Sequence, residues 1–404
     1  MRIAIVSQEY PPHTAYTGGI GRMYSTLAPA LARDGQRVEV LTITRGEPRS
    51  FESEGVLVHL VRRPTPDRLW FVDPLPWSYA VDRALGRLGR FDVVFAPEWF
   101  GEAARYSAHK RSGPLATELT TSVEQVLTIA ADWRRGRRMR LRHRQQRVLE
   151  RRQAERSDAI MASSRAIGRW AMELWDIGDT PGVVMPNMVD IARVQSIARA
   201  GALPEGFPRG GPLVVFAGRL EFRKGVLFLV DAMRDVWAAH PDAKLVLLGR
   251  DGDFNSRSMS AELARRAGAF ANRLHALGNH PPERLYPALL AADLVVLPSL
   301  WENFSLTAME ALALARPLVA TSGSGFDDFI DSGENGLLVP PGEVAPLADA
   351  INRLLSDAPL RESLARGASE RIKQLDVPPV TARHVEFFEQ VAAGSVPQTL
   401  SDAI

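Results

Sequence analysis

The chain has 404 residues, of which 46% are hydrophobic and 24% are charged, so it carries enough apolar side chains for two buried cores. It contains no cysteine, which excludes disulfides, thiolate catalysis and cysteine-ligated zinc. The formal net charge is only +2, but eleven Arg against two Glu from Arg134 to Arg156 give that segment +9 and leave −7 for the rest.

The first apolar run, residues 2–6, is followed closely by Gln8 and Glu9. It is too short for the core of a signal peptide and is typical of a buried strand. No run of 18 apolar residues occurs, so we expect no membrane-spanning helix. These features predict a cytoplasmic protein.

Short apolar runs typical of fully buried parallel strands recur along the chain. They occupy residues 2–6, 38–43, 56–61, 92–96, 158–163, 182–186, 212–218, 244–249, 293–298 and 317–321. Stretches of helical periodicity separate them, as at residues 20–34, 225–240 and 304–315. This alternation predicts an α/β fold with doubly wound parallel sheets.

The alternation pauses at residues 203–212, a stretch rich in Pro and Gly, which predicts a linker between two Rossmann-like domains. The tail after Ala392 is expected to be frayed. Ligands of such sheets bind beyond the carboxyl ends of the strands, near helix N-termini. The loops that follow the strands are therefore the places to look for function.

The glycine-rich segment TGGIGR, from Thr17 to Arg22, follows the first strand. Gly18, Gly19 and Gly21 would allow close approach to the backbone and a helix start with free N–H groups. Glycine runs are common, so this signal is weak by itself. It is not a dinucleotide fingerprint, and no Walker A sequence occurs in the chain.

The Arg-rich segment from Arg134 to Arg156 has the composition of a helix. A solvated helix face is the simplest interpretation. Attraction to an anionic membrane or to a phosphorylated acceptor is the next alternative. Nucleic acid fits less well, because aromatic residues do not alternate with the arginines.

The segment GRLEFRKG, residues 218–225, directly follows a predicted strand. It places Arg219 and Lys224 in a loop with a glycine at each end. The guanidinium group offers a planar fork and the ammonium group a point charge, and together they suit a diphosphate. A solvated turn is the alternative, weakened by the polar residues of the neighbouring loops.

Metal binding is not expected. Asp251 and Asp253 form a D-x-D tripeptide, but two acids in a turn are common. The eight His show no metal-binding spacing such as H-E-x-x-H.

The segment PSLWENFSLTAMEALALARP, residues 298–317, holds Glu302 and Glu310 in largely apolar surroundings. The pattern predicts that a strand ends near Ser299 and that a helix begins between Asn303 and Thr307. Glu310 could then serve only as the last member of a capping box that starts at Thr307. Glu302 has no such structural explanation, and a loop carboxylate there suits ligand hydroxyls.

Taken together and in their order along the chain, these motifs resemble those of family 4 glycosyltransferases with the GT-B fold. The most specific are E-x7-E, from Glu302 to Glu310, and G-R-L-x-x-x-K-G at residues 218–225. Supporting motifs extend over nearly the whole chain: YPP, GGIG, PEW, PNMVD, LYPALLAADLVVLPS and DSGENGLLVPPGE. The resemblance implies two Rossmann-like domains with parallel sheets that face each other across a cleft.

In such a fold, residues 1–205 would form the acceptor-binding domain, rejoined by a C-terminal helix at about residues 380–395. Residues 212–380 would bind the nucleotide sugar. The resemblance implies that Arg219 and Lys224 hold the diphosphate and stabilise its charge as it leaves. It also implies that Glu310 accepts hydrogen bonds from the ribose hydroxyls and that Glu302 contacts the donor sugar. Arg219, Lys224 and Glu302 would then be the catalytic residues.

The resemblance implies that Gly19 approaches the diphosphate and that N–H groups at a helix start face the donor, those of Phe304, Ser305, Leu306 and Thr307. Further candidates for the donor site are Gly18, Glu98, Thr120, Gly249 and Asn279. The family transfers sugar with retention of configuration and needs no metal or other cofactor beyond the nucleotide-sugar cosubstrate. Two cations and helix N–H groups can supply the electrostatic stabilisation that a metal would give.

Several positions depart from the family pattern. Thr120 stands where many relatives carry a His that can touch the donor sugar, with Glu118 on the same face of the strand. We therefore expect a donor other than the UDP forms of glucose and N-acetylglucosamine. Ser305 and Ala315 replace frequent glycines, and Asp328 stands where a Glu is usual.

The leading interpretation is a retaining glycosyltransferase, with UDP as the favoured donor nucleotide and a lipid-linked, phosphorylated or natural-product acceptor. One alternative is a GT-B sugar synthase or phosphorylase. Another is a catalytically silent protein that binds a sugar nucleotide. A third is a membrane-surface protein that uses the Arg-rich helix at the inner membrane face.

Overall fold

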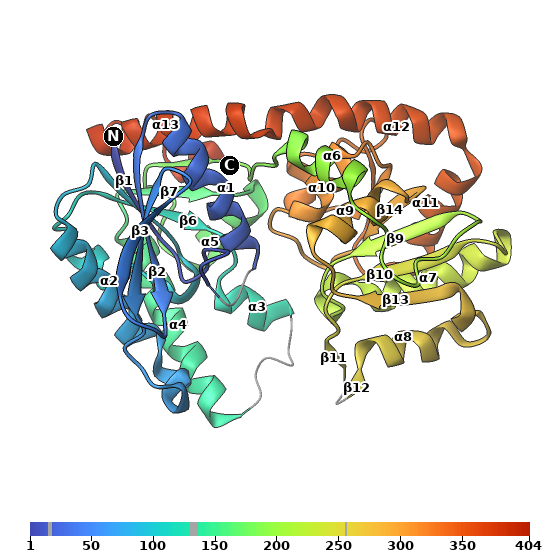
Figure 1. Cartoon of the computed structure of the whole chain (residues 1–404), viewed down its shortest axis with the longest axis horizontal. Coiled ribbons are helices and arrows are strands. Elements are labelled where there is room, and N and C mark those ends of the chain that lie inside the picture. Colours follow the sequence, from blue (N-terminus) through green and yellow to red (C-terminus); the bar gives the residue numbers. More distant parts are fainter. Residues whose placement is uncertain (15–17, 130–135, 255–256) are drawn as a thin grey trace. The chain divides into compact units, whose positions relative to one another are not determined.

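The computed structural model describes residues 1–14, 18–129, 136–254 and 257–404, and the chain folds into two compact units (Figure 1). Unit 1 comprises Met1–Met188 and Val377–Ile404, and unit 2 comprises Val189–Asp376. Thr17, Arg134 and Arg135, which belong to motifs of the sequence analysis, lie outside the described residues.

Unit 1 contains an eight-stranded sheet with the order β3-β4-β2-β1-β5-β6-β7-β8. Neighbouring strands are parallel except for the pair of β3 and β4. The strands are β1 (Arg2–Val6), β2 (Arg37–Thr44), β3 (Arg49–Ser53), β4 (Val56–Arg62), β5 (Val93–Pro97), β6 (Leu115–Leu119), β7 (Ala159–Ala162) and β8 (Gly182–Val184). The six strands predicted from apolar runs before residue 190 are confirmed. The edge strand β3, with mostly exposed side chains, was not predicted, and β6 was expected only from the family resemblance around Glu118 and Thr120.

Both faces of this sheet are covered by helices. In β1, Ile3 and Ile5 pack in a core with α1 and α13, while Ala4 and Val6 pack in a second core with α2. A strand buried on both faces is apolar throughout. The helices of unit 1 are α1 (Gly19–Arg33), α2 (Pro74–Leu88), α3 (Val123–Ile129), α4 (Arg137–Glu155), α5 (Arg165–Leu174), α13 (Val377–Ala393) and α14 (Leu400–Ala403).

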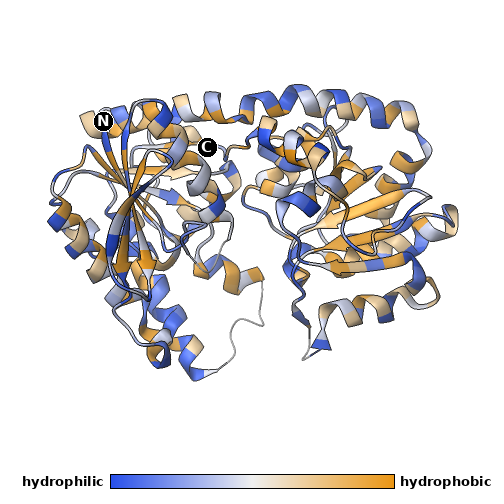
Figure 2. Cartoon of the chain, viewed as in Figure 1, coloured by the Kyte–Doolittle hydropathy of each residue, from blue (hydrophilic) through white to orange (hydrophobic). Residues whose placement is uncertain are grey.

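Three short 3-10 turns complete the description of unit 1: η1 (Asp67–Val72), η2 (Trp99–Gly101) and η3 (Tyr106–Ala108). Helix α4 contains the described part of the Arg-rich segment, so the predicted helix is confirmed. Its inner face buries Leu149, Glu150 and Gln153, and its outer face is strongly hydrophilic (Figure 2).

The expectation of a frayed tail after Ala392 is wrong. Thr399 caps α14 and forms a β-bridge with Pro181, next to β8. Leu400 is fully buried in a core with Ile160 and Ile167. Leu400, the partly buried Val396 and Ile404, and the backbone pairing at the end of the sheet hold this tail in place.

Unit 2 contains a six-stranded sheet with the order β13-β10-β9-β14-β15-β16, and every neighbouring pair is parallel. The strands are β9 (Leu213–Ala217), β10 (Lys244–Leu248), β13 (Leu274–Gly278), β14 (Leu294–Leu297), β15 (Leu318–Thr321) and β16 (Leu337–Val339), and a hairpin adds β11 (Asp253–Phe254) and β12 (Arg257–Ser258). The four strands predicted in this region are confirmed. Strands β13 and β16 were not predicted.

The helices of unit 2 are α6 (Ile191–Ala200), α7 (Val226–Ala239), α8 (Met259–Ala267), α9 (Pro282–Leu290), α10 (Leu306–Ala313), α11 (Val344–Ser356) and α12 (Ala358–Arg371). Short turns are η5 (Phe222–Lys224), η6 (Gly268–Arg273), η7 (Gly325–Asp328) and η8 (Ile372–Leu375). A single apolar core joins the helices to the sheet, and its strands are the most hydrophobic segments of the unit (Figure 2).

The chain passes from unit 1 to unit 2 between Met188 and Val189, earlier than the linker expected at residues 203–212. Helix α6 explains this difference, because it packs on α9 and so belongs to unit 2. The chain returns at Val377, and α13 then packs against α1.

Candidate active site

The E-x7-E segment forms the connection between β14 and α10. The strand ends at Leu297, and Ser305 caps the helix with its hydroxyl oxygen, which accepts a hydrogen bond from the N–H of Ala308 at 3.3 Å. The predicted helix start is confirmed. The capping-box alternative for Glu310 is wrong, because Thr307 lies inside the helix.

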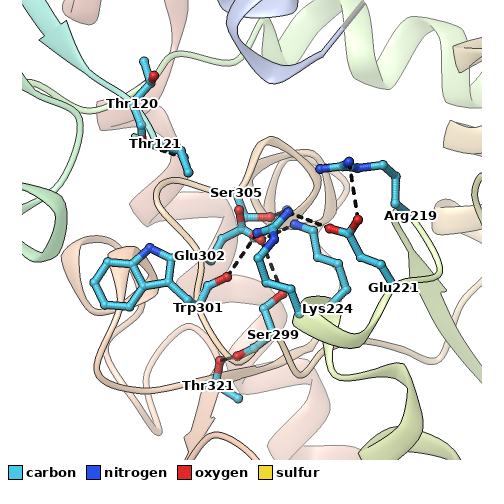
Figure 3. Close-up of polar contacts among 12 residues, drawn as sticks. Thr120, Thr121, Arg219, Glu221, Lys224, Ser299, Trp301, Glu302, Ser305 and Thr321 are labelled. Atoms are coloured by element: carbon cyan, nitrogen blue, oxygen red, sulfur yellow. Dashed lines mark hydrogen bonds and ion pairs between the residues drawn. The ribbon is translucent and has the colours of Figure 1, made fainter. Parts of the chain in front are cut away.

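Glu302 lies in this connection and forms a buried ion pair with Lys224 of η5 (Figure 3). The Ser299 hydroxyl also donates to Oε2 of Glu302, at 3.3 Å. Burial by itself would raise the pKa of Glu302, but the positive charges of Lys224 and Arg223 outweigh burial and hold it below its usual value. Burial lowers the pKa of Lys224, and Glu302 opposes that shift. The two predicted site residues therefore meet as a pair.

Arg223 joins the two loops, a role that the sequence analysis missed. Its Nη1 donates to the carbonyl oxygen of Trp301 at 3.3 Å, and its own carbonyl accepts from the N–H of Leu300 at 2.8 Å. Nη2 of Arg223 pairs with Glu221 at 2.8 Å, and the half-exposed Arg219 lies on the other oxygen of Glu221 at 3.3 Å. Glu221 thus holds one structural guanidinium group, that of Arg223, and one accessible group, that of Arg219, which Figure 3 shows beside Glu221.

Two glycines allow these loops to approach each other. Gly225 has φ +69°, and a Cβ atom there would lie 1.8 Å from the carbonyl oxygen of Pro298. A Cβ atom on Gly249 would lie 1.8 Å from the carbonyl oxygen of Gly218. Any side chain at either position would force the βα loops apart. Gly249 therefore has a packing role that stands beside its predicted donor contact.

Glu310 projects from α10 toward α9 and is buried. Its Oε1 accepts a hydrogen bond from the Tyr286 hydroxyl at 2.8 Å. This contact orients the carboxylate.

The site residues predicted for unit 2 all follow the carboxyl ends of its parallel strands. Arg219 and Lys224 follow β9, Gly249 follows β10, the exposed Asn279 follows β13, and the E-x7-E segment follows β14. Parallel strands bring these loops to one edge of the sheet, where ligands of α/β folds bind. The arrangement presents cations, carboxylates and the N-terminus of α10 together.

The D-x-D tripeptide has a structural role. Asp251 accepts hydrogen bonds from the Ser258 hydroxyl at 2.7 Å and from the N–H and hydroxyl of Ser260 at 2.9 and 2.7 Å. These contacts fix the start of α8. Within the described part of the chain, no group of three or more His, Asp or Glu is arranged to hold a metal ion.

In unit 1, the predicted residues Glu98 and Thr120 contact each other beyond β5 and β6. The N–H and hydroxyl of Thr120 donate to Oε2 of Glu98 at 2.7 and 2.9 Å. Burial raises the pKa of Glu98 to about 7, although the bonds from Thr120 oppose this shift. The strand partner Glu118 instead accepts from the Tyr24 hydroxyl at 2.6 Å.

The glycines at the start of α1 fall into two groups. Gly18 donates its N–H to Oε2 of Glu9 at 2.6 Å, and Cβ atoms on Gly18 or Gly21 would each lie 2.7 Å from a Glu9 atom. For Gly19, no atom of the described residues lies within 4 Å of the Cβ position. Packing therefore requires glycine at position 21, where the close atom is Cβ of Glu9. The Glu9 carboxylate near position 18 can move aside, and position 19 meets no such obstacle.

Solved structures share this architecture. Sucrose-phosphate synthase from Thermosynechococcus elongatus superposes with a TM-score of 0.77 at 23% identity, covering 98% of this chain and 100% of that one. Anabaena HepE in complex with UDP and glucose gives a TM-score of 0.72 at 20% identity, covering 96% and 99%. The fold is that of the GT-B glycosyltransferases, and this prediction is confirmed.

Sequence relatives define the family. Residues 204–371 match the family described as glycosyl transferases group 1, and residues 17–193 match glycosyltransferase family 4. A glycogen synthase of Mycobacterium tuberculosis is 31% identical over 92% of this chain and 90% of its own length. A phosphatidyl-myo-inositol mannosyltransferase of Mycobacterium leprae is 29% identical over 95% and 96%. The chain belongs to glycosyltransferase family 4 and is an enzyme that transfers sugar from a nucleotide-sugar donor.

No helix in the described residues is both long and apolar enough to cross a membrane.

Proposed function

We propose that the enzyme moves a sugar with retention of configuration from a UDP-sugar to an acceptor hydroxyl, and that unit 2 binds the donor. The observation that carries this proposal is the buried pair of Lys224 and Glu302, with the accessible Arg219 beside it at the carboxyl edge of the sheet. Two cations at such an edge suit a diphosphate. Anabaena HepE, with the same fold, was solved with UDP and glucose, which supports UDP as the nucleotide.

In this proposal, the diphosphate takes over part of the Lys224 charge that Glu302 now neutralises. The carboxylate of Glu302, thus released, accepts hydrogen bonds from hydroxyl groups of the donor sugar. Arg219 can turn from Glu221 to the phosphates, because its side chain is 50% exposed. The N–H groups of residues 304–307 at the start of α10 add positive potential at the same edge.

In the same proposal, Glu310 accepts hydrogen bonds from the ribose hydroxyls. Tyr286 occupies one of its oxygens and so fixes the direction of the carboxylate. A carboxylate provides about four lone-pair sites, so a carboxylate held in a fixed direction suits a pair of vicinal hydroxyls.

The chemical step consists of attack by the acceptor oxygen on the anomeric carbon, from the face that the diphosphate leaves. The carbon–oxygen bond to the diphosphate breaks, and the departing phosphate oxygen takes the acceptor proton. Lys224 and Arg219 stabilise the charge that develops on the diphosphate. These side chains and the N–H groups of α10 provide that stabilisation without a metal.

We further propose that the acceptor carries phosphate, either lipid-linked or soluble. Relatives include a phosphatidyl-myo-inositol mannosyltransferase and a D-inositol 3-phosphate glycosyltransferase, and both names refer to a phosphate-containing compound. Helix α4 supports an anionic partner, because Arg137, Arg144 and Arg151 recur every seven residues on its exposed face. Leu141 and Val148, both exposed, share that face and suit a peripheral contact with an anionic membrane surface.

The test is calorimetry and thermal denaturation of the wild type, Glu310→Gln and Tyr286→Phe against UDP, GDP, ADP and their sugar conjugates, without added metal. We expect UDP and one UDP-sugar to bind the wild type. A ligand concentration of about 100 times Kd should stabilise the folded state by about 2.7 kcal/mol. Glu310→Gln should lose most of this response, because Gln can still accept from Tyr286 but lacks the charge and acceptor capacity of a carboxylate.

Tyr286→Phe is the matched control, since it removes one hydrogen bond to Glu310 and leaves the carboxylate in place. If both variants lower basal stability and neither changes nucleotide affinity, Glu310 has only a structural role. A response to GDP or ADP but not to UDP would overturn the proposed donor. UDP-glucose belongs in the same screen, because a clear preference for it would contradict the expectation drawn from Thr120.

A further inference from the structure

A surface cavity of about 550 Å³ in unit 1, open to solvent, is rich in positive charge. Three arginines line it, Arg45, Arg62 and Arg63, together with a single carboxylate, Asp67. The proposed donor chemistry in unit 2 uses none of these residues.

The arginines come together because two parallel strands end side by side. Thr44 at the end of β2 is paired in register with Arg62 at the end of β4, and the N–H of Arg63 donates to the carbonyl oxygen of Thr44 at 2.8 Å. Arg45 and Arg63 are therefore the first residues beyond neighbouring strands. This is the carboxyl edge of the sheet, where ligands of α/β folds bind.

The arginines are held in different ways. Arg63 is 11% exposed and fixed by Asp73, which accepts from its Nε at 2.7 Å and from its Nη2 at 2.5 Å. Asp67 bridges Nη1 of Arg63 at 2.8 Å and Nη2 of Arg45 at 3.1 Å. Asp67 is 68% exposed, and exposed ion pairs contribute only about 0–1 kcal/mol. An external anion can therefore replace this carboxylate at little cost.

Charge balance favours such an anion. Asp73 matches Arg63 and Asp67 matches Arg45, which leaves the exposed Arg62 in excess at the cavity. The loop that carries these groups contains Pro64 and Pro66, which restrict its backbone. Guanidinium groups bind phosphate oxygens in a bidentate manner, and a phosphate needs several of them to converge.

We propose that this cavity binds the phosphate group of the acceptor, with Arg45, Arg62 and Arg63 as its ligands and Asp67 as the internal anion that it displaces. The inference deepens the proposed function and rests on it for the statement that the phosphate belongs to an acceptor. The binding of phosphate itself is independent of the donor site. The phosphate comes either from a soluble phosphate monoester or from a lipid headgroup.

The test is a calorimetric titration of inorganic phosphate into the enzyme saturated with UDP, at low ionic strength. Arg62→Gln should weaken phosphate binding roughly tenfold, the effect of losing one charged hydrogen bond. Asp67→Asn should strengthen binding, because the internal competitor is gone. Arg83→Gln and Asp34→Asn, exposed positions of unit 1 outside the cavity, make the same charge changes and should resemble the wild type.

The proposal is overturned if phosphate does not bind saturably to the wild type, or if each cavity variant behaves like its control. UDP affinity is measured on the same variants without phosphate. A normal UDP affinity together with lost phosphate binding in Arg62→Gln separates this site from the donor site. An enzyme that binds phosphate in this pattern but not UDP would contradict the proposed donor and uphold the cavity.

Cosedimentation with vesicles of equal parts phosphatidylcholine and phosphatidylglycerol identifies the source of the phosphate. Retention that Arg62→Gln loses and Arg83→Gln keeps assigns the cavity to a lipid headgroup. No retention of the wild type assigns it to a soluble phosphate. Both results uphold the cavity as a phosphate site.

Discussion

Buried glutamates lie at or beyond the carboxyl ends of strands in both units, but their surroundings differ. In unit 2, Glu302 pairs with Lys224, and the pKa of Glu302 lies below its usual value although burial alone would raise it. In unit 1, burial raises the pKa of Glu98 to about 7 and those of Glu102 and Glu118 to about 8. The same residue type thus carries a charge in one unit and holds a proton near neutral pH in the other.

The partners explain the difference. Glu102 accepts from the Trp77 indole N–H and from the N–H of Gln8, both at 3.1 Å, and Glu118 accepts from Tyr24. These neutral donors satisfy oxygen atoms without compensating a charge, so desolvation dominates. A buried acid at the edge of a sheet is therefore not evidence of an ionic site by itself. Such an acid is ionised at neutral pH only where a cation lies beside it.

The largest effect should follow removal of the cation in unit 2. Lys224→Gln should lower the rate of sugar transfer by about 10²–10³-fold, because the charge on the departing diphosphate loses a stabilising group. It should also lower the free energy of unfolding by about 3–5 kcal/mol, because Glu302 remains buried without its partner. Steady-state kinetics and urea denaturation measure the two effects.

The double variant Lys224→Gln/Glu302→Gln separates these effects. It contains no buried unpaired charge, so most of the stability should return while transfer stays slow. Recovery of activity together with stability would show that Lys224 acts only through the fold. Arg223→Gln is a poor control, since Arg223 also holds the carbonyl oxygen of Trp301.

A smaller effect is expected from pH, with opposite signs in the two units. The unfolded value for Glu is 4.5, and the folded values of Glu98, Glu102 and Glu118 are higher, so the native state keeps protons that the unfolded chain releases. Unit 1 should therefore lose stability as pH rises from about 5 to 8, on the order of 2 kcal/mol for one group. The contribution of Glu302 is present above 4.5 and is lost below it, because its folded pKa is lowered.

Glu118→Gln tests the first of these slopes. The amide oxygen can still accept from the Tyr24 hydroxyl, but the group no longer titrates. Urea denaturation at pH 5, 7 and 9 should show a weaker loss of stability at high pH in this variant than in the wild type. Equal slopes would mean that Glu118 is already ionised in the folded protein and that the comparison between the units fails there.

Much of the fold was predictable because its signals are local. Continuous apolar runs identified ten strands, and the sequence around E-x7-E placed Glu302 in the loop before α10 and Glu310 inside the helix. Strand β3 was missed because its side chains are largely exposed, and the docking of Leu400 was missed because isolated apolar residues in a polar tail form no pattern.

The pairings within the site were not predictable. Lys224 and Glu302 are 78 residues apart, and so are Arg223 and Trp301, so nothing in either local sequence indicates the partner. Glu98 and Thr120 meet only because β5 and β6 are neighbours in the sheet. Sequence patterns predicted which loops carry function, whereas strand order decided which side chains of those loops meet.

The smallest effect concerns whether unit 1 contributes backbone rather than charge to the donor. Gly19→Ala should leave stability unchanged or raise it by about 0.4–1 kcal/mol, because a Cβ atom there meets open space among the described residues. If the Gly19 backbone contacts the donor, as the family resemblance implies, affinity for the UDP-sugar should fall about fivefold, or about 1 kcal/mol.

Gly21→Ala is the matched comparison. Its Cβ atom would lie 2.7 Å from Cβ of Glu9, so this variant should lose about 1–3 kcal/mol of stability by overpacking. Position 21 tests packing and position 19 tests ligand approach, with the same added methyl group in the same helix. An unchanged donor affinity in Gly19→Ala would restrict donor recognition to the cations and carboxylates of unit 2, because steric room at position 19 would then serve no ligand.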